Sequence, residues 1–261
     1  MRFSLCFEMF YPQLDVVERL RPIKEAGFDQ VEFWSPYDKD LDALRREALR
    51  LGLGVARFSG HRNHSPVIAT ELEGFLGEIE QNIKAAQALG CPQLIVLSDA
   101  LQASGAAKPA NLSDRQKWNH LQSALEQATL LAERGGIQLC LEPLNVYDHP
   151  DYFLRCCEPA FEQVRAIDSP QLKVLFDVYH AQRSQGRILE TIAQHVEDIA
   201  CFHLADVPGR FEPGTGELHY ANILNAIEDL GFEGTIGFEC LPQQDEASAL
   251  KTLRSLIEPF V

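Results

Sequence analysis

Short apolar runs alternate with longer amphipathic segments from one end of the chain to the other. The runs are rich in Val, Ile, Leu and Phe, as is typical of strands buried on both faces of a parallel sheet. They predict eight strands, at residues 2–8, 30–34, 54–58, 93–97, 137–142, 172–177, 199–203 and 234–239.

The segments between these runs carry apolar residues at helical spacing. In the first of them, Leu14, Val17 and Leu20 fall on one stripe. Glycine ends four of the first five segments just before the next strand, as it commonly ends helices. The pattern predicts eight helices, at residues 13–26, 41–51, 69–89, 113–134, 159–166, 188–195, 220–230 and 247–259. Residues 98–111, rich in Ala, Gly and Ser, are predicted to form a loop over the mouth of the sheet.

Eight strands alternating with eight helices predict an α/β protein, a (β/α)8 TIM barrel with its active site at the C-terminal ends of the strands. The chain has 261 residues, close to the usual length of one such barrel, and no linker interrupts it. Residues 1–261 are therefore predicted to form a single domain. An open doubly wound sheet is the alternative, but it would normally place a glycine-rich turn after the first strand, where this chain has FEMFYPQ.

Composition and charge narrow the classes of function. The chain has 38 acidic and 23 basic residues, a net charge of −15 that disfavours binding to nucleic acid or to an anionic membrane surface. No apolar stretch approaches the roughly 20 residues of a membrane span, and MRFSLCFEMF lacks the features of a signal peptide. The seven cysteines are scattered without C-x-x-C spacing, which indicates buried reduced thiols. We therefore expect a cytoplasmic protein that acts on a small molecule.

Four metal-ligating side chains stand at or next to the ends of the last four predicted strands. They are 35, 26 and 36 residues apart, about one strand and one helix each time: Glu142, Asp177, His203 and Glu239. Each acid alone could instead cap a helix. Together, however, residues at successive C-terminal strand ends converge on one barrel mouth, where three carboxylates would repel each other without a cation. The oxygen-rich set suits Mn²⁺, Mg²⁺ or Co²⁺ better than a structural Zn²⁺.

Several segments around these positions carry a resemblance to a known family. LEPLN at 141–145, FDVYH at 176–180 and HLADVPGRFEPGTGELHY at 203–220 resemble the hydroxypyruvate isomerase family, within the xylose-isomerase-like superfamily of sugar isomerases and epimerases. The similarity spans nearly the whole chain and includes VEFWSPYD at 31–38 and DHPDYFL at 148–154. It implies a (β/α)8 barrel with one divalent metal ion, held by Glu142, Asp177, His203 and Glu239, and no nucleotide cofactor.

The resemblance also implies catalytic and substrate-binding roles. Glu142 and Glu239 would act as the acid–base pair that moves a proton between neighbouring carbons through an enediolate. His180 matches the family's Asp-x-x-His pattern and would donate to a substrate oxygen; the alternative is a helix-start histidine bonded to backbone. Arg210, in a Pro-Gly-Arg turn, would clamp a substrate carboxylate unless it lies on the surface. Asn145 would contact substrate or shape its loop.

Other polar residues near strand ends have open roles. His61 and His64, in SGHRNHSP, are spaced as a second metal site could require, but a mobile polar loop is the preferred interpretation. Glu8 ends the first predicted strand, and Glu32 and Trp34 lie at the end of the second. For these three residues, packing or capping is at least as consistent with the sequence as contact with substrate.

The leading hypothesis is a metal-dependent isomerase that converts hydroxypyruvate to tartronate semialdehyde. The chain departs from the hydroxypyruvate isomerases at His203, where they often carry Gln, and in its shorter loop after the third strand. These departures leave open a ketose 3-epimerase or a 2-oxo-tetronate isomerase that uses the same site. An apurinic endonuclease of the same superfamily would need further histidines and a basic face for DNA. A homo-oligomer is also left open, since related barrels often pair across subunits.

Overall fold

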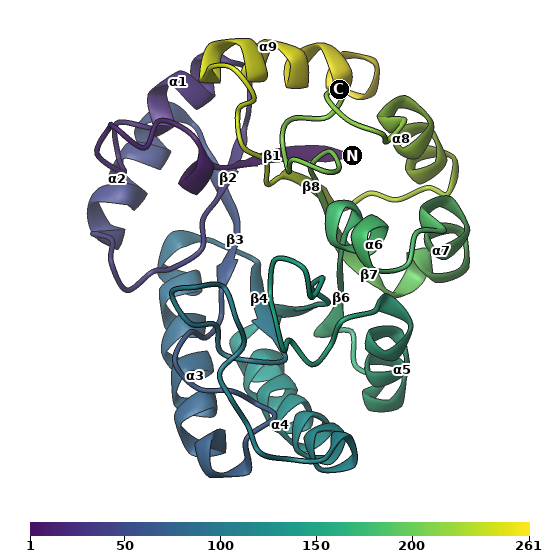
Figure 1. Cartoon of the computed structure of the whole chain (residues 1–261). Helices are drawn as coiled ribbons and strands as arrows, with labels where there is room; N and C mark the ends of the chain where they lie inside the picture. The colour runs from purple at the N-terminus through teal and green to yellow at the C-terminus, as the bar shows by residue number, and fades with distance from the viewer.

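The computed structural model describes residues 1–261 and shows a closed barrel of eight strands (Figure 1). Each strand pairs in parallel with the next one along the chain, and β8 pairs in parallel with β1. The prediction of a (β/α)8 barrel is confirmed. The strands are β1 (Arg2–Cys6), β2 (Gln30–Glu32), β3 (Gly54–Ser59), β4 (Gln93–Leu97), β5 (Gln138–Glu142), β6 (Leu172–Asp177), β7 (Ile199–Leu204) and β8 (Thr235–Phe238).

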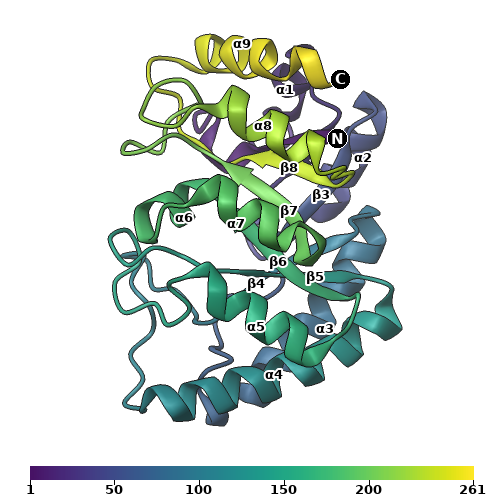
Figure 2. The same cartoon turned by 90° about the vertical axis from the view of Figure 1, so that its right-hand side faces the viewer.

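The helices form a ring around the barrel (Figures 1 and 2). Short 3-10 turns occupy Phe7–Met9, Ala69–Glu71, Val196–Asp198 and Glu258–Phe260. The α-helices are α1 (Leu20–Glu25), α2 (Leu41–Leu51), α3 (Leu72–Leu89), α4 (Asp114–Gly135), α5 (Cys157–Ile167), α6 (Val178–Ser184), α7 (Ile188–His195), α8 (Tyr220–Asp229) and α9 (Glu246–Ile257).

The apolar runs are buried as their composition predicts. All six residues of β7 are buried, and a cluster of 62 buried residues joins the strands to the surrounding helices. A small separate cluster fills part of the barrel: Ile95, Cys140, Leu175, Ala200 and Cys201. The seven cysteines form no disulfide, and six of them are buried. The predicted buried thiols are thus present.

Helix ends follow the sequence signals. Ser113 and Gln116 form a capping box at the start of α4, which satisfies backbone N–H groups that the first turn leaves free. Gly52, Gly90 and Gly136 end α2, α3 and α4 in the left-handed conformation, with φ near 65° (66°, 67° and 64°). Because a side chain is strained at such φ values, glycine sets where these helices stop.

The first predicted helix is wrong in its extent. Helical spacing predicts residues 13–26, but regular helix begins only at Leu20, after a series of turns. Pro22 explains the difference, because proline has no N–H to bond a carbonyl four residues earlier and is tolerated only in a first turn. Arg19 then holds the preceding turns together by donating to the carbonyls of Leu14 and Phe7, at 3.0 and 3.3 Å.

A ninth helix, α6, is missing from the predicted set of eight. It begins directly after β6, where Asp177 accepts hydrogen bonds from the backbone N–H groups of Tyr179 and His180, at 2.7 and 3.1 Å. An aspartate in this position is a strong N-cap. The crossover from β6 to β7 therefore contains two helices, α6 and α7, where the sequence pattern predicts one.

The long loops gather on the side of the barrel where α6 begins (Figure 2). Residues 98–111 lack helix, as predicted, and residues 99–103 and 105 line a cavity at this end. None of the helices is both long enough and apolar enough to cross a membrane. The carboxyl ends of the strands thus open toward a mouth that loops partly enclose.

Candidate metal centre and active site

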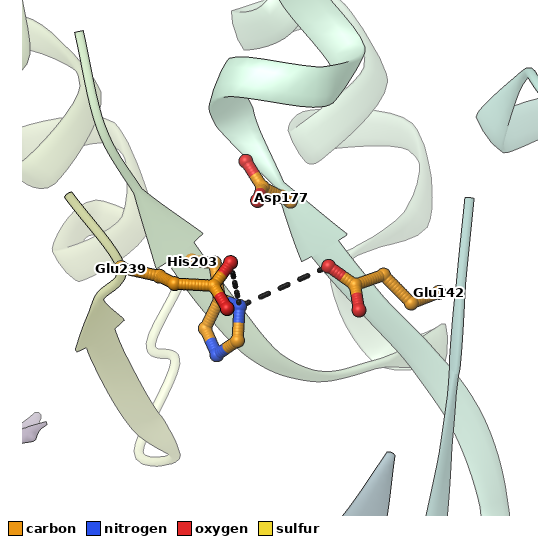
Figure 3. A group of neighbouring side chains, drawn as sticks. All are labelled: Glu142, Asp177, His203 and Glu239. Carbon is orange, nitrogen blue, oxygen red and sulfur yellow. Dashed lines mark ion pairs between the residues drawn. The ribbon is translucent and has the colours of Figure 1, made fainter. Parts of the chain in front are cut away.

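The structure brings the four candidate metal ligands together at the carboxyl ends of β5 to β8. Glu142 and Asp177 are the last residues of β5 and β6, His203 is next to last in β7, and Glu239 directly follows β8. All four are buried, and one ligand atom from each lies within 4.8 Å of the others. Figure 3 shows the side chains of Glu239 and Glu142 approaching Nδ1 of His203 from opposite directions, with Asp177 above them.

Direct contacts tie this cluster together. The Nδ1 atom of His203 lies 3.5 Å from Oε2 of Glu239 and 3.8 Å from Oε1 of Glu142. Arg210 donates from Nη2 to Oε2 of Glu239 at 2.5 Å, and the indole N–H of Trp34 donates to the other oxygen, Oε1. Both oxygens of Glu239 are therefore engaged.

The three carboxylates differ in how readily they ionise. Burial, with repulsion from Glu239 and Asp177, raises the pKa of Glu142 well above its ordinary value, although His203 opposes the shift. Burial raises the pKa of Asp177 to about 6 against the opposing charges of Arg210 and His203. Burial would raise the pKa of Glu239 too, but Arg210, His203 and Trp34 outweigh it and lower that pKa. Three acids this close do not all stay ionised without an added positive charge.

The donor set fits a divalent cation. Oε1 of Glu142 and Nδ1 of His203 are buried without a hydrogen-bond partner. Burial alone would lower the pKa of His203, but Glu32 and Glu239 raise it well above its ordinary value, so the ring carries positive charge among the acids. A cation would take the place of the Nδ1 proton and balance the carboxylates. Three carboxylates and one imidazole could hold Mn²⁺, Mg²⁺ or Co²⁺.

His180 has one ring nitrogen fixed and the other free. Its Nδ1 atom lies 3.2 Å from the backbone N–H of Asn145 and 2.7 Å from the Asn145 side-chain amide, and both groups donate to it. Burial and the charge of Arg210 lower the pKa of His180 well below its ordinary value, so the ring is neutral and its proton is on Nε2. That Nε2–H is buried without a hydrogen-bond partner, 3.7 Å from Asp177. It is available to donate to a substrate.

Contact of Asn145 with substrate stays a prediction, because the contacts of its side chain in the structure are all within the protein. Its side chain is fully buried behind His180, and its Oδ1 atom accepts from the backbone N–H groups of Tyr147 and Asp148, both at 3.0 Å. Its Nδ2 atom donates to His180 and to Asp148. These contacts favour the alternative that the sequence left open, in which Asn145 shapes its loop, and they hold the ring of His180.

Arg210 points into the acidic cluster, away from the surface. Its backbone has a φ of 55°, and its carbonyl accepts from the N–H of Leu241 at 2.8 Å. The guanidinium lies over the ring of Tyr179, 5.3 Å from the centroid, and 3.9 Å from Asp177. Its Nε atom is buried without a partner. The arginine therefore balances the acids and keeps a free N–H for a substrate oxygen.

A cavity of about 380 Å³ opens onto these groups. Its lining includes Glu142, His180, Arg210 and Glu239, together with Trp34, Ser35, Tyr37, Arg62 and loop residues 99–103. A larger hollow of about 980 Å³ lies near Lys117, Trp118 and Arg155, but none of the candidate ligands lines it. The smaller cavity is therefore the one where the clustered acids could meet a substrate.

Comparison with known proteins decides the family. Residues 20–258 match the family described as xylose isomerase-like TIM barrel. The chain belongs to this family. A hydroxypyruvate isomerase from Escherichia coli (strain K12) is 28% identical and covers 96% of this chain and 97% of its own. A 2-oxo-tetronate isomerase from Cupriavidus necator is 27% identical and covers 97% of each chain. These relatives are isomerases, and the prediction of an isomerase from this family is confirmed.

Solved structures of similar proteins have the same fold. A structure described as an AP endonuclease, family 2, from Brucella melitensis has a TM-score of 0.90 and 26% identity, and covers 99% of this chain and 98% of its own. A 3-keto-D-glucoside 4-epimerase from E. coli has a TM-score of 0.85 and 20% identity over 99% of both chains, a likeness in fold alone. One barrel architecture therefore occurs in proteins described by different activities.

His61 does not belong to a second metal site in this xylose isomerase-like barrel. It is buried, with Nδ1 at 3.0 Å from the carbonyl of His64 and Nε2 at 3.0 Å from the N–H of Leu97. Burial lowers the pKa of His61 to about 4, so the ring is neutral and both nitrogens are engaged. His64 instead contacts Glu78, at 3.3 Å. His61, which the sequence placed in a mobile polar loop, is part of the packed interior.

Two residues of the site have roles that the sequence does not reveal. Trp34 donates to Glu239, which is 205 positions away, and Glu32 contacts His203 inside the barrel. Glu8, in contrast, pairs with Lys39 at 2.6 Å. The only available signal is that Glu32 and Trp34 stand near the end of a predicted strand, where barrel sites are built.

Proposed function

We propose that the protein is a divalent-metal-dependent isomerase that interconverts hydroxypyruvate and tartronate semialdehyde. One observation carries the proposal: two carboxylates and two buried donors without partners line the same cavity. The carboxylates are Glu142 and Glu239, and the donors are Nε2 of His180 and Nε of Arg210. Such a set can hold the oxygens of a small acid and move a proton within it.

The acid–base pair would act from two sides of the substrate. A divalent cation bound at the cluster would polarise the substrate carbonyl and hydroxyl and stabilise the negative charge that develops on them. One of Glu142 and Glu239 takes a proton from the hydroxymethyl carbon and returns it to the neighbouring carbonyl carbon. The other carboxylate moves the hydroxyl proton between the two oxygens. Their opposed placement in Figure 3 supports this division of roles.

His180 and Arg210 would orient the substrate. The Nε2–H of His180 is held in place by Asn145 and would donate to a substrate oxygen. The guanidinium of Arg210 would donate to the substrate carboxylate, because a charged N–H makes a strong hydrogen bond with an ionised acid. Its contact with the ring of Tyr179 limits the positions that the guanidinium can take.

A second candidate is isomerisation of a four-carbon acid, as in the 2-oxo-tetronate isomerases. The cavity of about 380 Å³ continues beyond the acids to Tyr37 and Arg62, which leaves room for a substrate longer than three carbons. The Nη1 atom of Arg62 contacts Ser35 at 3.0 Å and would sit beside the far end of such a substrate. The two carboxylates on opposite sides would also suit a ketose 3-epimerase.

An apurinic endonuclease fits the chain less well. The net charge of −15 opposes binding to a phosphate backbone. A multi-metal site would need further histidines near the mouth, and His61 has both ring nitrogens engaged by backbone groups. The single cluster of four ligands supports one metal ion.

The test is solvent-proton exchange during turnover. The protein is loaded with Mn²⁺ in D₂O and incubated separately with hydroxypyruvate, a 2-oxo-tetronate and a ketose, and each product is analysed by NMR after removal of the metal. We expect turnover of hydroxypyruvate with deuterium at the carbon next to the carboxylate. Faster reaction of the four-carbon acid or of the ketose would favour the second candidate. No turnover of any of the three, or cleavage of abasic DNA instead, would contradict the proposal.

A further inference from the structure

A buried carboxylate lies next to the metal centre without lining the cavity. Glu32, the last residue of β2, is 1% exposed. Its Oε2 atom lies 2.7 Å from Nε2 of His203, the nitrogen that faces away from the other three candidate ligands. Neither the family match nor the proposed isomerase mechanism gives Glu32 a role.

Both oxygens of Glu32 are held by other groups. Nη1 of Arg57 donates to Oε1 and Oε2 at 2.8 and 2.9 Å, and the hydroxyl of Ser4 donates to Oε1. Arg57 is itself fully buried and donates from Nε to the side chain of Gln93 at 3.1 Å. The carboxylate therefore has fixed partners on several sides, and it has little freedom to turn.

Small residues on the strands between them allow the side chains of Glu32 and His203 to come into contact. Two strands, β1 and β8, separate β2 from β7, and they carry small residues at the level of His203: Gly237 pairs with both His203 and Ser4. A Cβ atom on Gly237 would lie 2.0 Å from Oε1 of Glu32 and 2.9 Å from the ring of His203. Any larger residue there would push the carboxylate and the imidazole apart.

The opposite edge of the His203 ring faces the other ligands. Its Nδ1 atom lies 3.5 Å from Glu239 and 3.8 Å from Glu142, and has no hydrogen-bond partner (Figure 3). A histidine that binds a metal through one nitrogen commonly donates from the other to a carboxylate, which fixes the ring and its tautomer. Glu32 and His203 have this arrangement.

We propose that Glu32, held by Arg57 and Ser4, is the positioning residue of the metal centre. It accepts the Nε2–H of His203, fixes the plane of the ring, and so keeps Nδ1 directed at the cation. This inference rests on the metal centre of the proposed function, and it adds a group that touches neither metal nor substrate. Without Glu32, the ring could turn or carry its only proton on Nδ1, and in either case the nitrogen lone pair would no longer face the metal.

The direct test is NMR of the unaltered protein with ¹¹³Cd²⁺ as the probe. Histidine side chains are labelled with ¹⁵N, and the His203 signals are assigned by comparison with His203→Gln. We expect coupling of the cadmium nucleus to Nδ1 of His203, and a retained, hydrogen-bonded proton on Nε2. Coupling through Nε2 would overturn the role of Glu32 and leave the proposed function standing. No coupling to His203 would overturn the metal centre, and the positioning role with it.

A pair of variants tests the same role through metal affinity. Replacing Glu32 alone would leave Arg57 as an unpaired buried charge, so both are changed, in Glu32→Gln with Arg57→Met. We expect the double variant to bind Cd²⁺ roughly 10- to 100-fold more weakly in calorimetric titration, the usual effect of removing a carboxylate behind a metal-binding histidine. The matched control is Glu78→Gln, which removes a carboxylate beside His64, outside the cluster, and should leave the affinity unchanged.

Two results of the titration would contradict the proposal. One is wild-type affinity in a folded double variant, and the other is an equal loss in Glu78→Gln. The NMR experiment uses the unaltered protein, so it decides the question even if the double variant does not fold. Neither readout depends on isomerase activity, so each can fail independently of the choice of substrate.

Discussion

Glu239→Gln is expected to lower kcat for the true substrate by at least about 1,000-fold, within the range that a positioned acid or base contributes. The carboxylate is buried at the end of β8, faces the cavity, and is kept ionised by Arg210, His203 and Trp34 in spite of its burial. An amide of the same shape has no basic oxygen to take a proton. Steady-state rates at saturating Mn²⁺, on whichever substrate the exchange experiment identifies, measure the loss.

Two controls separate chemistry from metal loss and from unfolding. Glu239 is also a candidate ligand, so Mn²⁺ binding to the variant is titrated, and the rate must stay low at full occupancy. Glu228→Gln, on the exposed side of α8, changes the same functional group outside the site and should keep full activity. Undiminished turnover by Glu239→Gln would refute the acid–base assignment.

Arg210→Met is expected to reduce kcat/KM for an acid substrate by about 100-fold, the usual value of a charge-assisted hydrogen bond to a carboxylate. The guanidinium lines the cavity with a free Nε, and the only other arginine or lysine in the lining is Arg62. Initial rates with hydroxypyruvate and with an uncharged ketose, both at saturating Mn²⁺, measure the effect. The loss should be much larger for the acid.

The matched control for Arg210 is Arg210→Lys. It keeps the positive charge beside Glu239 but lacks the planar fork, so it should recover only part of the activity on the acid. Equal losses on the acid and the ketose would contradict a role in holding the substrate carboxylate. They would indicate that Arg210 acts only through its 2.5 Å contact with Glu239.

The barrel and its four candidate metal ligands could be predicted because both are indicated by short stretches of sequence. Each buried strand is a short apolar run, and each candidate ligand stands at or beside the end of one, so parallel pairing alone brings Glu142, Asp177, His203 and Glu239 to one mouth. The resemblance of the segments around them then suggested which of these acids would move protons. No details of packing were needed for either step.

The remaining features depend on contacts between distant residues. Glu32 and His203 are 171 positions apart in the sequence. Their side chains are in contact only because strand register places Gly237 and Ser4 at the same level. The burial of His61 depends on its packing against Phe75, with ring centroids 4.9 Å apart, although its neighbours in sequence are polar. The contact between Asn145 and His180 is of the same kind, since it joins the loop after β5 to α6.

The first predicted helix is wrong in its extent for a different reason. Helical spacing of Leu14, Val17 and Leu20 is a pattern of side chains, whereas Pro22 acts through a missing backbone donor. Leu20 is buried in the core, but Leu14 and Val17 are only partly buried, and the backbone forms turns until Leu20. Backbone hydrogen bonding, and not the spacing of apolar side chains, determines where this helix begins. In the same way, the Asp177 cap starts α6, whose apolar stripe is too short to predict a helix.

The central claim is that one divalent cation, held by Glu142, Asp177, His203 and Glu239, makes the barrel an active isomerase. It is tested most directly by stoichiometric titration of the metal-free protein with Mn²⁺, with turnover of hydroxypyruvate measured at each addition. We predict no turnover at the start and a linear rise that breaks at one ion per chain. Full turnover without added metal, or a break at two or three ions per chain, would contradict it.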